Sequence, residues 1–262
     1  MTVIDHPVRG VHRVSRWIFN AYAIDATDGG RPLVIDLGLS SQVPAINRII
    51  GADRSPLICA THLHTDHVSG VPEMCRTRHI EFAASVKGRD YVAGERPRTP
   101  GPREVARILP VLRDQPFDRG AYPDVIRNRR YGYGSGGFAL PTEPITWLDD
   151  GDEVPGAPGW HVVRAPGHTD DSIALHHAER HILASGDAVL SVGGRAWFNP
   201  ELTDRTVIAD TVDRLRSLRV SVLLPGHGRP VVANDVWREA LDWTERPGTL
   251  SRCGRRTGQG VT

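Results

Sequence analysis

The sequence predicts an α/β fold built in layers. Short apolar runs typical of strands alternate with segments of helical periodicity along most of the chain. Several strand-like runs end in a turn that carries a histidine or an aspartate. Hydrophobic residues make up 39% of the 262 residues, which suffices for a sizeable buried core. We therefore expect helices packed on β-sheet, with polar side chains placed where strands end.

The first third of the chain supplies the clearest element signals. Residues 17–24 (WIFNAYAI) and 32–38 (PLVIDLG) flank the turn sequence DATDGG and predict a hairpin. Residues 40–50 begin with serine, a good N-cap, and predict a helix. The elements expected next are a strand in 56–62, a helix in 69–78 and a strand in 79–85.

Residues 85–146 have a different character. They are rich in Pro, Gly and Arg, and only 102–114 reads as a helix, interrupted by Pro110. We interpret this segment as an insertion or lid, with a flexible surface excursion as the alternative. Ten arginines lie between Arg89 and Arg130. They form either a clamp for an anionic acyl carrier or RNA phosphates, or a solvated surface in a protein that uses arginine for nearly all its positive charge.

Regular signals return after residue 146. Strand-like runs are expected in 159–169, 172–187 and 220–230, an amphipathic helix in 204–219 and a last helix in 234–245. We expect one domain over residues 1–247 and a disordered Gly/Arg-rich tail over 248–262.

Composition narrows the function classes. The net charge of +1 gives no overall field that favours nucleic acid or an anionic membrane. Three cysteines without CxxC spacing favour a reducing compartment. The first residues contain no apolar run typical of a signal peptide, and no stretch approaches the ~20 apolar residues of a membrane span. We expect a cytoplasmic protein without membrane contact, and composition leaves its oligomeric state open.

Four stretches combine a strand-like run, a turn and metal-binding side chains. The first, THLHTDH, places three histidines and one aspartate within six positions, and the others contain PGHT, SGDA and PGHG. The side chains are His62, His64, Asp66, His67, His168, Asp187 and His227. A catalytic zinc usually takes three protein ligands and a water, so seven donors favour two ions that share an activated water. Taken singly, each histidine would be read as part of a polar turn.

These motifs, in this order, resemble the metallo-β-lactamase superfamily over about Trp17 to Val232. The resemblance implies a four-layer αββα sandwich, in which two mixed sheets are flanked by helices. It implies that His62, His64 and His168 bind one metal, that Asp66, His67 and His227 bind the other, and that Asp187 bridges them. Asp36, in VIDLG, would orient the ligand loop.

The ligand set resembles one branch of that superfamily. Asp187 stands where some lactamases carry a cysteine ligand, and PGHTDDSIAL with SGDAVL is similar to glyoxalase-II-like dinuclear hydrolases. We expect a hydroxide between two Zn²⁺ ions, with iron or manganese as alternative metals, to attack a thioester, ester or lactone. Asp66 would steer the water and pass a proton to the leaving group.

Two other activities remain open, as does the substrate. A phosphodiesterase or endoribonuclease would use the same two ions, and an enzyme resembling persulfide dioxygenases would use one iron. We expect a small acyl substrate, either free or bound to a carrier, rather than nucleic acid. Arg195, Trp197 and Phe198 follow Asp187 closely and would either line an acyl pocket or pack in the core.

Overall fold

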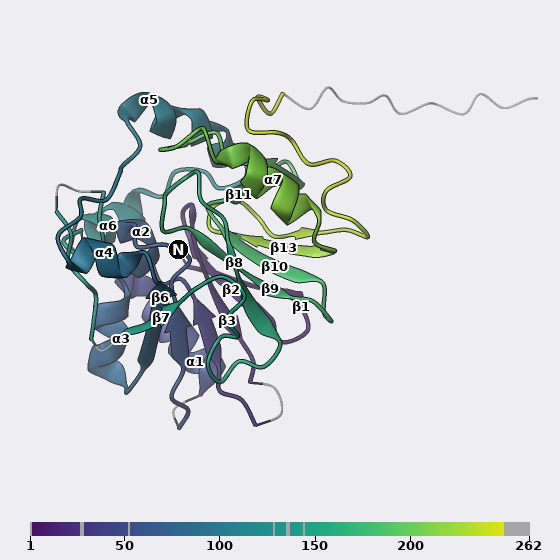
Figure 1. The fold of residues 1–262 in the computed structure, drawn as a ribbon. Coiled ribbons are helices and arrows are strands. Elements are labelled where there is room, and N and C mark those ends of the chain that lie inside the picture. Colours follow the sequence, from purple (N-terminus) through teal and green to yellow (C-terminus); the bar gives the residue numbers. More distant parts are fainter. Residues whose placement is uncertain are drawn as a thin grey trace, which may run out of the picture.

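Two β-sheets pack face to face between helices in the computed structural model, which describes residues 2–26, 29–51, 53–127, 129–134, 137–143 and 145–248 (Figure 1). In these ranges the first sheet has seven strands, in sequence order: β1 (Val3–Val8), β2 (Val11–Arg16), β3 (Phe19–Ile24), β4 (Leu33–Ile35), β5 (Leu57–Cys59), β6 (Glu81–Ser85) and β7 (Ile145–Leu148). Neighbours are antiparallel from β1 to β4 and parallel from β4 to β7.

The second sheet has five strands among the described residues. Their spatial order is β14 (Val231–Val232), β13 (Val222–Pro225), β10 (Ile182–Gly186), β9 (Ile173–His177) and β8 (Trp160–Arg164). Only the β10–β13 pair is parallel. A separate hairpin of β11 (Val189–Val192) and β12 (Arg195–Phe198) follows β10.

The helices are short. They are η1 (Ser40–Gln42), α1 (Val43–Ile50), α2 (Thr65–Val68), α3 (Val71–Thr77), α4 (Gly88–Val92), α5 (Pro102–Val105), η2 (Ala106–Arg113), η3 (Arg119–Ala121), α6 (Tyr122–Arg127) and α7 (Ile208–Arg216). In Figure 1, α1 and α3 lie beside the first sheet and α7 lies beside the second. Within the described ranges, no helix combines the length and apolar character needed to cross a membrane.

Apolar residues fill the space between the sheets and beneath the helices. In β4, Leu33 and Ile35 point between the sheets, whereas Val34 joins the cluster under α1 and α3. In β10, Leu183 points the other way from its neighbours and packs under α7. Since both faces of these strands are covered, their sequences are continuous apolar runs. The result is the four-layer αββα arrangement that the sequence predicts.

Four strands deliver the predicted donors to one edge of the sandwich. β5 runs parallel to its neighbours in the first sheet and leads into THLHTDH. In the second sheet β8, β10 and β13 run in one direction, since β8 and β10 are both antiparallel to β9 and β10 is parallel to β13. Their carboxyl ends lead to His168, Asp187 and His227.

Two predicted helices need correction. The helix expected over 234–245 is wrong, because backbone pairing with β12 competes with it. Leu241 N donates to Ala196 O at 2.9 Å, and Phe198 N donates to Leu241 O at 3.0 Å. The helix expected over 102–114 is divided into α5 and the 3₁₀ helix η2, which contains Pro110. The predicted tail lies outside the described residues, apart from Gly248.

Candidate metal centre

The seven side chains predicted as metal ligands lie together in the structure. Their donor atoms form overlapping groups, and within each group the atoms lie within 4.8 Å of one another. The groups are His62, His64 and His168; His62, His67 and Asp187; and Asp66, His67 and His227. The donors therefore come from the ends of strands in both sheets.

The first group consists of three imidazoles whose nitrogens face one another. His64 Nδ1 lies 3.0 Å from His62 Nε2 and 3.2 Å from His168 Nε2. His62 and His168 are 1% and 2% exposed, so water cannot readily satisfy these nitrogens. Three lone pairs at this spacing are suited to a cation between them.

Asp187 connects this group to the second group, which is formed by Asp66, His67 and His227. Its Oδ2 atom lies 3.1 Å from His227 Nε2, 3.4 Å from His67 Nε2 and 3.6 Å from His168 Nε2. Asp66 completes the second group, with its Oδ2 atom 3.3 Å from His227 Nε2. One carboxylate thus reaches donors of both groups, as expected of a bridging ligand.

For three of the rings, hydrogen bonds on the far side fix which nitrogen faces the centre. His67 Nδ1 lies 2.8 Å from Asp36 Oδ2, His168 Nδ1 lies 2.8 Å from Glu201 O, and His227 Nδ1 lies 2.9 Å from Ile18 O. An oxygen acceptor at Nδ1 requires the proton there, so the lone pair is at Nε2.

Thr61 fixes which nitrogen of His62 faces the centre in a similar way. Its hydroxyl donates to Asp36 Oδ2 at 2.9 Å, and the hydroxyl oxygen lies 3.2 Å from His62 Nδ1. Because the hydroxyl proton is engaged by Asp36, the oxygen accepts from His62 and leaves Nε2 as the lone-pair atom. Asp36, predicted as an orienting residue, thus contacts His67 directly and His62 through Thr61.

Two buried polar atoms test whether these residues fit metal ions. His67 Nε2 and Asp187 Oδ1 are buried and have no hydrogen-bond partner among the described residues. Such atoms are costly unless a ligand satisfies them. Both belong to the predicted donor set, so the residues fit a bound cation.

Electrostatics points the same way. Burial, with neighbouring imidazoles, holds the pKa of His62 well below its usual value and lowers the pKa of His64 to about 3, which keeps both rings neutral. Burial also opposes the charge on His67 and His227, but the Asp187 carboxylate and its acidic neighbours outweigh it and raise the pKa of both. The second group therefore has a negative potential that favours cations.

Glycine allows two chain segments to approach the centre closely. A Cβ on Gly226 would lie 2.2 Å from Asp187 Oδ1 and 2.7 Å from His67 Cε1. A Cβ on Gly38 would lie 1.8 Å from Asp66 O. Any larger residue at these positions would displace donor-bearing segments.

Buried polar residues that the sequence analysis missed hold the His227 loop. Asn20 Nδ2 donates to Pro225 O at 2.9 Å and to Gly228 O at 2.7 Å. Gln115, which belongs to segment 85–146, accepts a hydrogen bond from Gly228 N at 2.7 Å. No local motif marks either residue, because their partners are more than a hundred residues away.

A second missed set holds the His64 loop. Asp171 Oδ2 accepts a hydrogen bond from Leu63 N at 2.8 Å, and Tyr133 donates its hydroxyl proton to Asp171 Oδ1. The Tyr133 ring packs edge-on against His64 at 4.6 Å, and Tyr133 O accepts a bond from Thr65 N at 3.0 Å. Asp171 follows PGHT in the sequence, which was the available signal.

A cavity of about 330 Å³ opens over the donors. Its lining includes His64, Asp66, His168, Asp187 and His227. Segment 85–146 supplies part of the wall through Thr99, Pro100, Val105, Ile108, Val125, Arg129 and Tyr133. Glu201, another residue that the sequence analysis missed, also lines the cavity, and burial raises its pKa.

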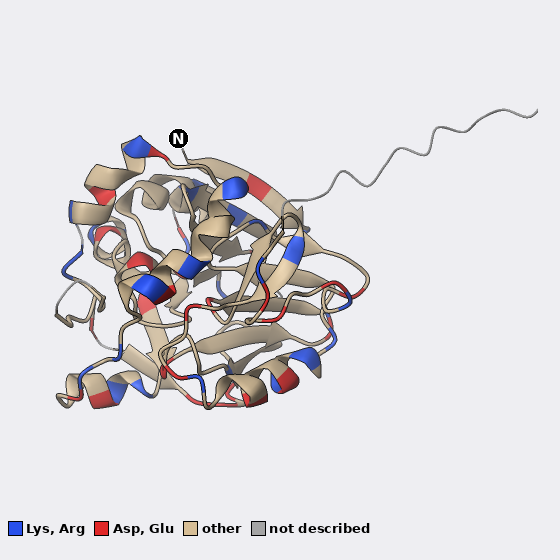
Figure 2. Cartoon of the chain, turned by 90° about the horizontal axis from the view of Figure 1, so that it is seen from above, with Lys and Arg blue, Asp and Glu red and all other residues tan. Residues whose placement is uncertain are grey.

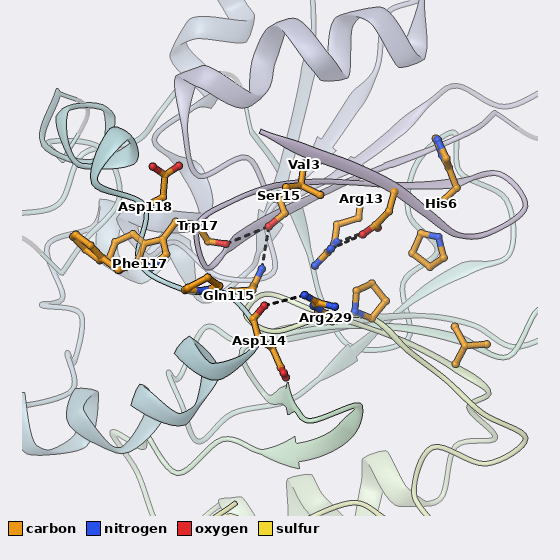
Figure 3. A pocket seen from close by; sticks show the side chains of 15 residues that line it. Val3, His6, Arg13, Ser15, Trp17, Asp114, Gln115, Phe117, Asp118 and Arg229 are labelled. Atoms are coloured by element: carbon orange, nitrogen blue, oxygen red, sulfur yellow. Dashed lines mark hydrogen bonds and ion pairs between the residues drawn. The ribbon is translucent and has the colours of Figure 1, made fainter. Parts of the chain in front are cut away.

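A larger cavity, of about 700 Å³, contains none of the predicted donors. Figure 3 shows Arg13, Ser15 and Trp17 on one side of it, facing Gln115 and Arg229. Its charged groups are largely paired with protein atoms: Arg13 forms an ion pair with Asp5, and Arg229 donates to Asp114 O at 3.3 Å. The donor-lined cavity is therefore the candidate active site.

Arg195, Trp197 and Phe198, for which the sequence left an acyl pocket and the core both open, do not line the donor cavity. Trp197 and Phe198 are 1% and 0% exposed and pack in two apolar clusters. Arg195 Nε donates to Glu239 O at 2.8 Å. None of the three lines the donor cavity, and the two aromatic residues occupy core positions, the alternative open from the sequence.

Comparison with known sequences gives clear matches. A family model described as the metallo-beta-lactamase superfamily matches residues 16–227. The probable metallo-hydrolase YflN of Bacillus subtilis (strain 168) is 25% identical, and the match covers 91% of this chain and 91% of that protein. The acyl-coenzyme A thioesterase MBLAC2 of Gallus gallus is 30% identical, with 87% of this chain and 80% of that protein covered.

Solved structures support the fold. The crystal structure of TTHA1623 in a di-iron-bound form aligns with a TM-score of 0.57 and 21% identity. The alignment covers 90% of this chain and 98% of that one. The αββα fold class predicted from the sequence is thus confirmed.

Proposed function

Because the chain belongs to the metallo-beta-lactamase superfamily, we propose that this metallohydrolase is a dinuclear enzyme that cleaves carboxylic thioesters, with esters and lactones as related substrates. One observation carries the proposal. Asp187 lies between two groups of three donors, with its Oδ2 atom 3.6 Å from His168 Nε2 of one group and 3.1 Å from His227 Nε2 of the other. A purely structural ion would not need a second donor group or a cavity over it.

The residues divide naturally between two ions. His62, His64 and His168 would hold one, Asp66, His67 and His227 would hold the other, and Asp187 would bridge them. Zinc suits these imidazole and carboxylate donors, and the di-iron-bound structural neighbour makes iron the main alternative. When bound, two such ions supply Lewis acidity and lower the pKa of a water to about 7.

Asp66 is placed to transfer a proton from the attacking water to the leaving group. Its side chain is 32% exposed, whereas those of Asp187 and His227 are each 3% exposed. Asp66 can therefore meet both a water and a substrate in the cavity. In thioester hydrolysis the water oxygen bonds to the acyl carbon and the C–S bond breaks. Asp66 would take a proton from the water and return one to the leaving sulfur.

The cavity favours an acyl substrate. Ile18, Phe19, Leu39, Val105, Ile108 and Val125 give it an apolar lining next to the donors. An acyl chain would pack against these side chains while its carbonyl faced the centre. We extend the proposal to segment 85–146, which would act as the cover of this site. The similarity to MBLAC2, named as an acyl-coenzyme A thioesterase, supports the same substrate class.

The two alternative activities are less well supported. Figure 2 shows basic and acidic residues intermixed over the helices and loops of the face in view, whereas a ribonuclease would benefit from a basic track for the RNA backbone. A mononuclear-iron enzyme would leave the second group, Asp66, His67 and His227, without a purpose.

A substrate panel on metal-defined protein tests the proposal. Protein stripped by a chelator is reconstituted with zinc, iron or manganese and assayed on an acyl thioester, a lactone, bis-p-nitrophenyl phosphate and RNA. We expect no turnover without metal and the highest kcat/KM on the thioester. Full activity in metal-free protein, or turnover of the phosphodiesters alone, would refute it.

Two aspartate variants test whether the measured turnover comes from this protein rather than from a contaminating enzyme. Asp187→Ala removes the shared carboxylate and is expected to abolish turnover and reduce bound metal. Asp213→Ala alters an exposed residue of α7 and is expected to behave as wild type.

A further inference from the structure

The guanidinium of one arginine that lines the donor cavity has no partner among the residues that the structure describes. Arg129 follows α6 and lines the cavity together with Val125 of that helix. In the described part of the chain, neither a hydrogen bond nor an ion pair engages its guanidinium, and its side chain is exposed. A free guanidinium in a cavity is a ready site for a carboxylate or a phosphate.

The other arginines of segment 85–146 do not share this position. Arg98 Nη1 lies 3.3 Å from Asp204 Oδ2, Arg113 Nη1 donates to Pro247 O at 2.8 Å, and Arg130 donates to the Tyr131 hydroxyl at 2.9 Å. Of the arginines between Arg89 and Arg130, only Arg129 is among the described residues that line the donor cavity. Of the ten arginines that the sequence offers for binding an anion in this segment, the structure therefore leaves Arg129 as the candidate.

The helix that precedes Arg129, α6, is anchored beside the centre. Asp124, in α6, is buried and accepts a hydrogen bond from Ser41 N at 2.9 Å. Ser41 is two residues from Leu39, which also lines the cavity. This hydrogen bond ties α6 to the segment that contains Leu39, and the side chains of Leu39, Val125 and Arg129 line the same cavity.

We propose that Arg129 binds an anionic oxygen group of the substrate, a phosphate of the leaving group or a carboxylate at the far end of the acyl chain. The inference rests on the proposed thioesterase function and adds a charge requirement to it. The reacting carbonyl would face the donors, the acyl chain would lie on the apolar wall, and the negative charge would meet Arg129. Uncharged thioesters would be cleaved without this contact.

Three thioesters separate the possible sources of charge. Octanoyl-coenzyme A carries phosphates on the leaving group, suberyl-N-acetylcysteamine carries a terminal carboxylate on an acyl chain of equal length, and octanoyl-N-acetylcysteamine carries neither. The variants are Arg129→Gln, Arg129→Lys and, as the matched control, Arg127→Gln. Arg127 is an exposed arginine at the end of α6 and does not line the cavity.

We expect Arg129→Gln to raise KM about tenfold for the anionic thioester whose charge Arg129 binds, either octanoyl-coenzyme A or suberyl-N-acetylcysteamine. The value of kcat should change little, because the charged hydrogen bond that is lost forms when the substrate binds, before the reaction. KM for octanoyl-N-acetylcysteamine and all constants of Arg127→Gln should stay unchanged. Arg129→Lys should restore part of the loss. Calorimetric titration with coenzyme A and with suberate should show the same selective weakening without turnover.

The outcomes distinguish this inference from the proposed function. If wild type cleaves all three thioesters and Arg129→Gln changes none of them, or changes all equally, the anion site is refuted and the hydrolase stands. If metal-loaded wild type cleaves no thioester, both are refuted.

Discussion

Asp36 shows how much a single residue contributes to the centre. Its φ of 56° lies in the left-handed region, where asparagine and aspartate are tolerated better than most residues. From this position its carboxylate accepts hydrogen bonds from Thr61 N at 2.8 Å and from the His67 ring at 2.8 Å. With the Thr61 hydroxyl, three donor groups converge on this side chain, so a residue with fewer acceptors would leave at least one of them unsatisfied.

Asp36→Asn should weaken metal binding and activity by about 10- to 100-fold. Asparagine suits the backbone, but one of its two orientations turns the amide NH₂ toward His67 Nδ1–H and the other turns it toward Thr61 N–H. Calorimetric zinc titration and kcat/KM at saturating metal measure the effect. Asp25→Asn alters an exposed aspartate that also contacts a histidine, His12, and should change neither quantity. Equal behaviour of the two variants would contradict the role of Asp36.

Gly226→Ala should disrupt the centre more than it disrupts the fold. The new methyl group would press on Asp187 and His67, at 2.2 and 2.7 Å, so the donors must move. We expect metal affinity to fall at least about tenfold, with a loss of about 1–3 kcal/mol in the free energy of unfolding. Gly137→Ala, which meets no atom within 4 Å, is the control for metal titration and urea unfolding. Unchanged metal affinity in Gly226→Ala would contradict this geometry.

At the scale of elements, segment 85–146 is joined to the donor loops by hydrogen bonds. Tyr133 forms an isolated parallel bridge with His64, and its hydroxyl reaches Asp171, which is 0% exposed. Gln115 makes the corresponding link to the His227 loop. The segment therefore supports the centre and also supplies part of the wall of the donor cavity.

Tyr133→Phe should lower the free energy of unfolding by about 1–3 kcal/mol, because it leaves a buried carboxyl oxygen of Asp171 without a donor. Urea unfolding measures the loss, and an unchanged m-value would show that the unfolded state is unaffected. The matched control is Tyr131→Phe, in which the lost hydroxyl only accepts a bond from Arg130. A loss of similar size in both variants would argue against the Asp171 contact.

Local sequence patterns predicted the elements that carry the donors. The runs before His62, His168, Asp187 and His227 are strands, because buried strands leave a strong apolar signal. The same patterns predicted a helix over 234–245, where Leu241 instead pairs with β12. Asn20 and Gln115 were missed for a related reason, since their hydrogen bonds connect segments distant in sequence. Contacts of this kind become visible only when the sheets are packed together.

Considered as a whole, the molecule should depend on metal for part of its stability. A ligand that binds only the native state stabilises it by about 4 kcal/mol when its free concentration is a thousand times Kd. We expect a chelator to lower the melting temperature and zinc to restore it, as followed by circular dichroism. The melting temperature of Asp187→Ala, which lacks the shared carboxylate, should respond much less to the chelator. An identical response of both proteins would contradict the shared site.

The division of the donors between the two sheets has a consequence for biogenesis. His62, His64, Asp66 and His67 follow a strand of the first sheet, whereas His168, Asp187 and His227 follow strands of the second. A nascent chain that has formed only the first sheet can therefore complete neither of the two proposed metal sites. Because folding during synthesis proceeds from the N-terminus, capture of the first ion should wait until His168 and Asp187 have left the ribosome, and capture of the second until His227 has followed.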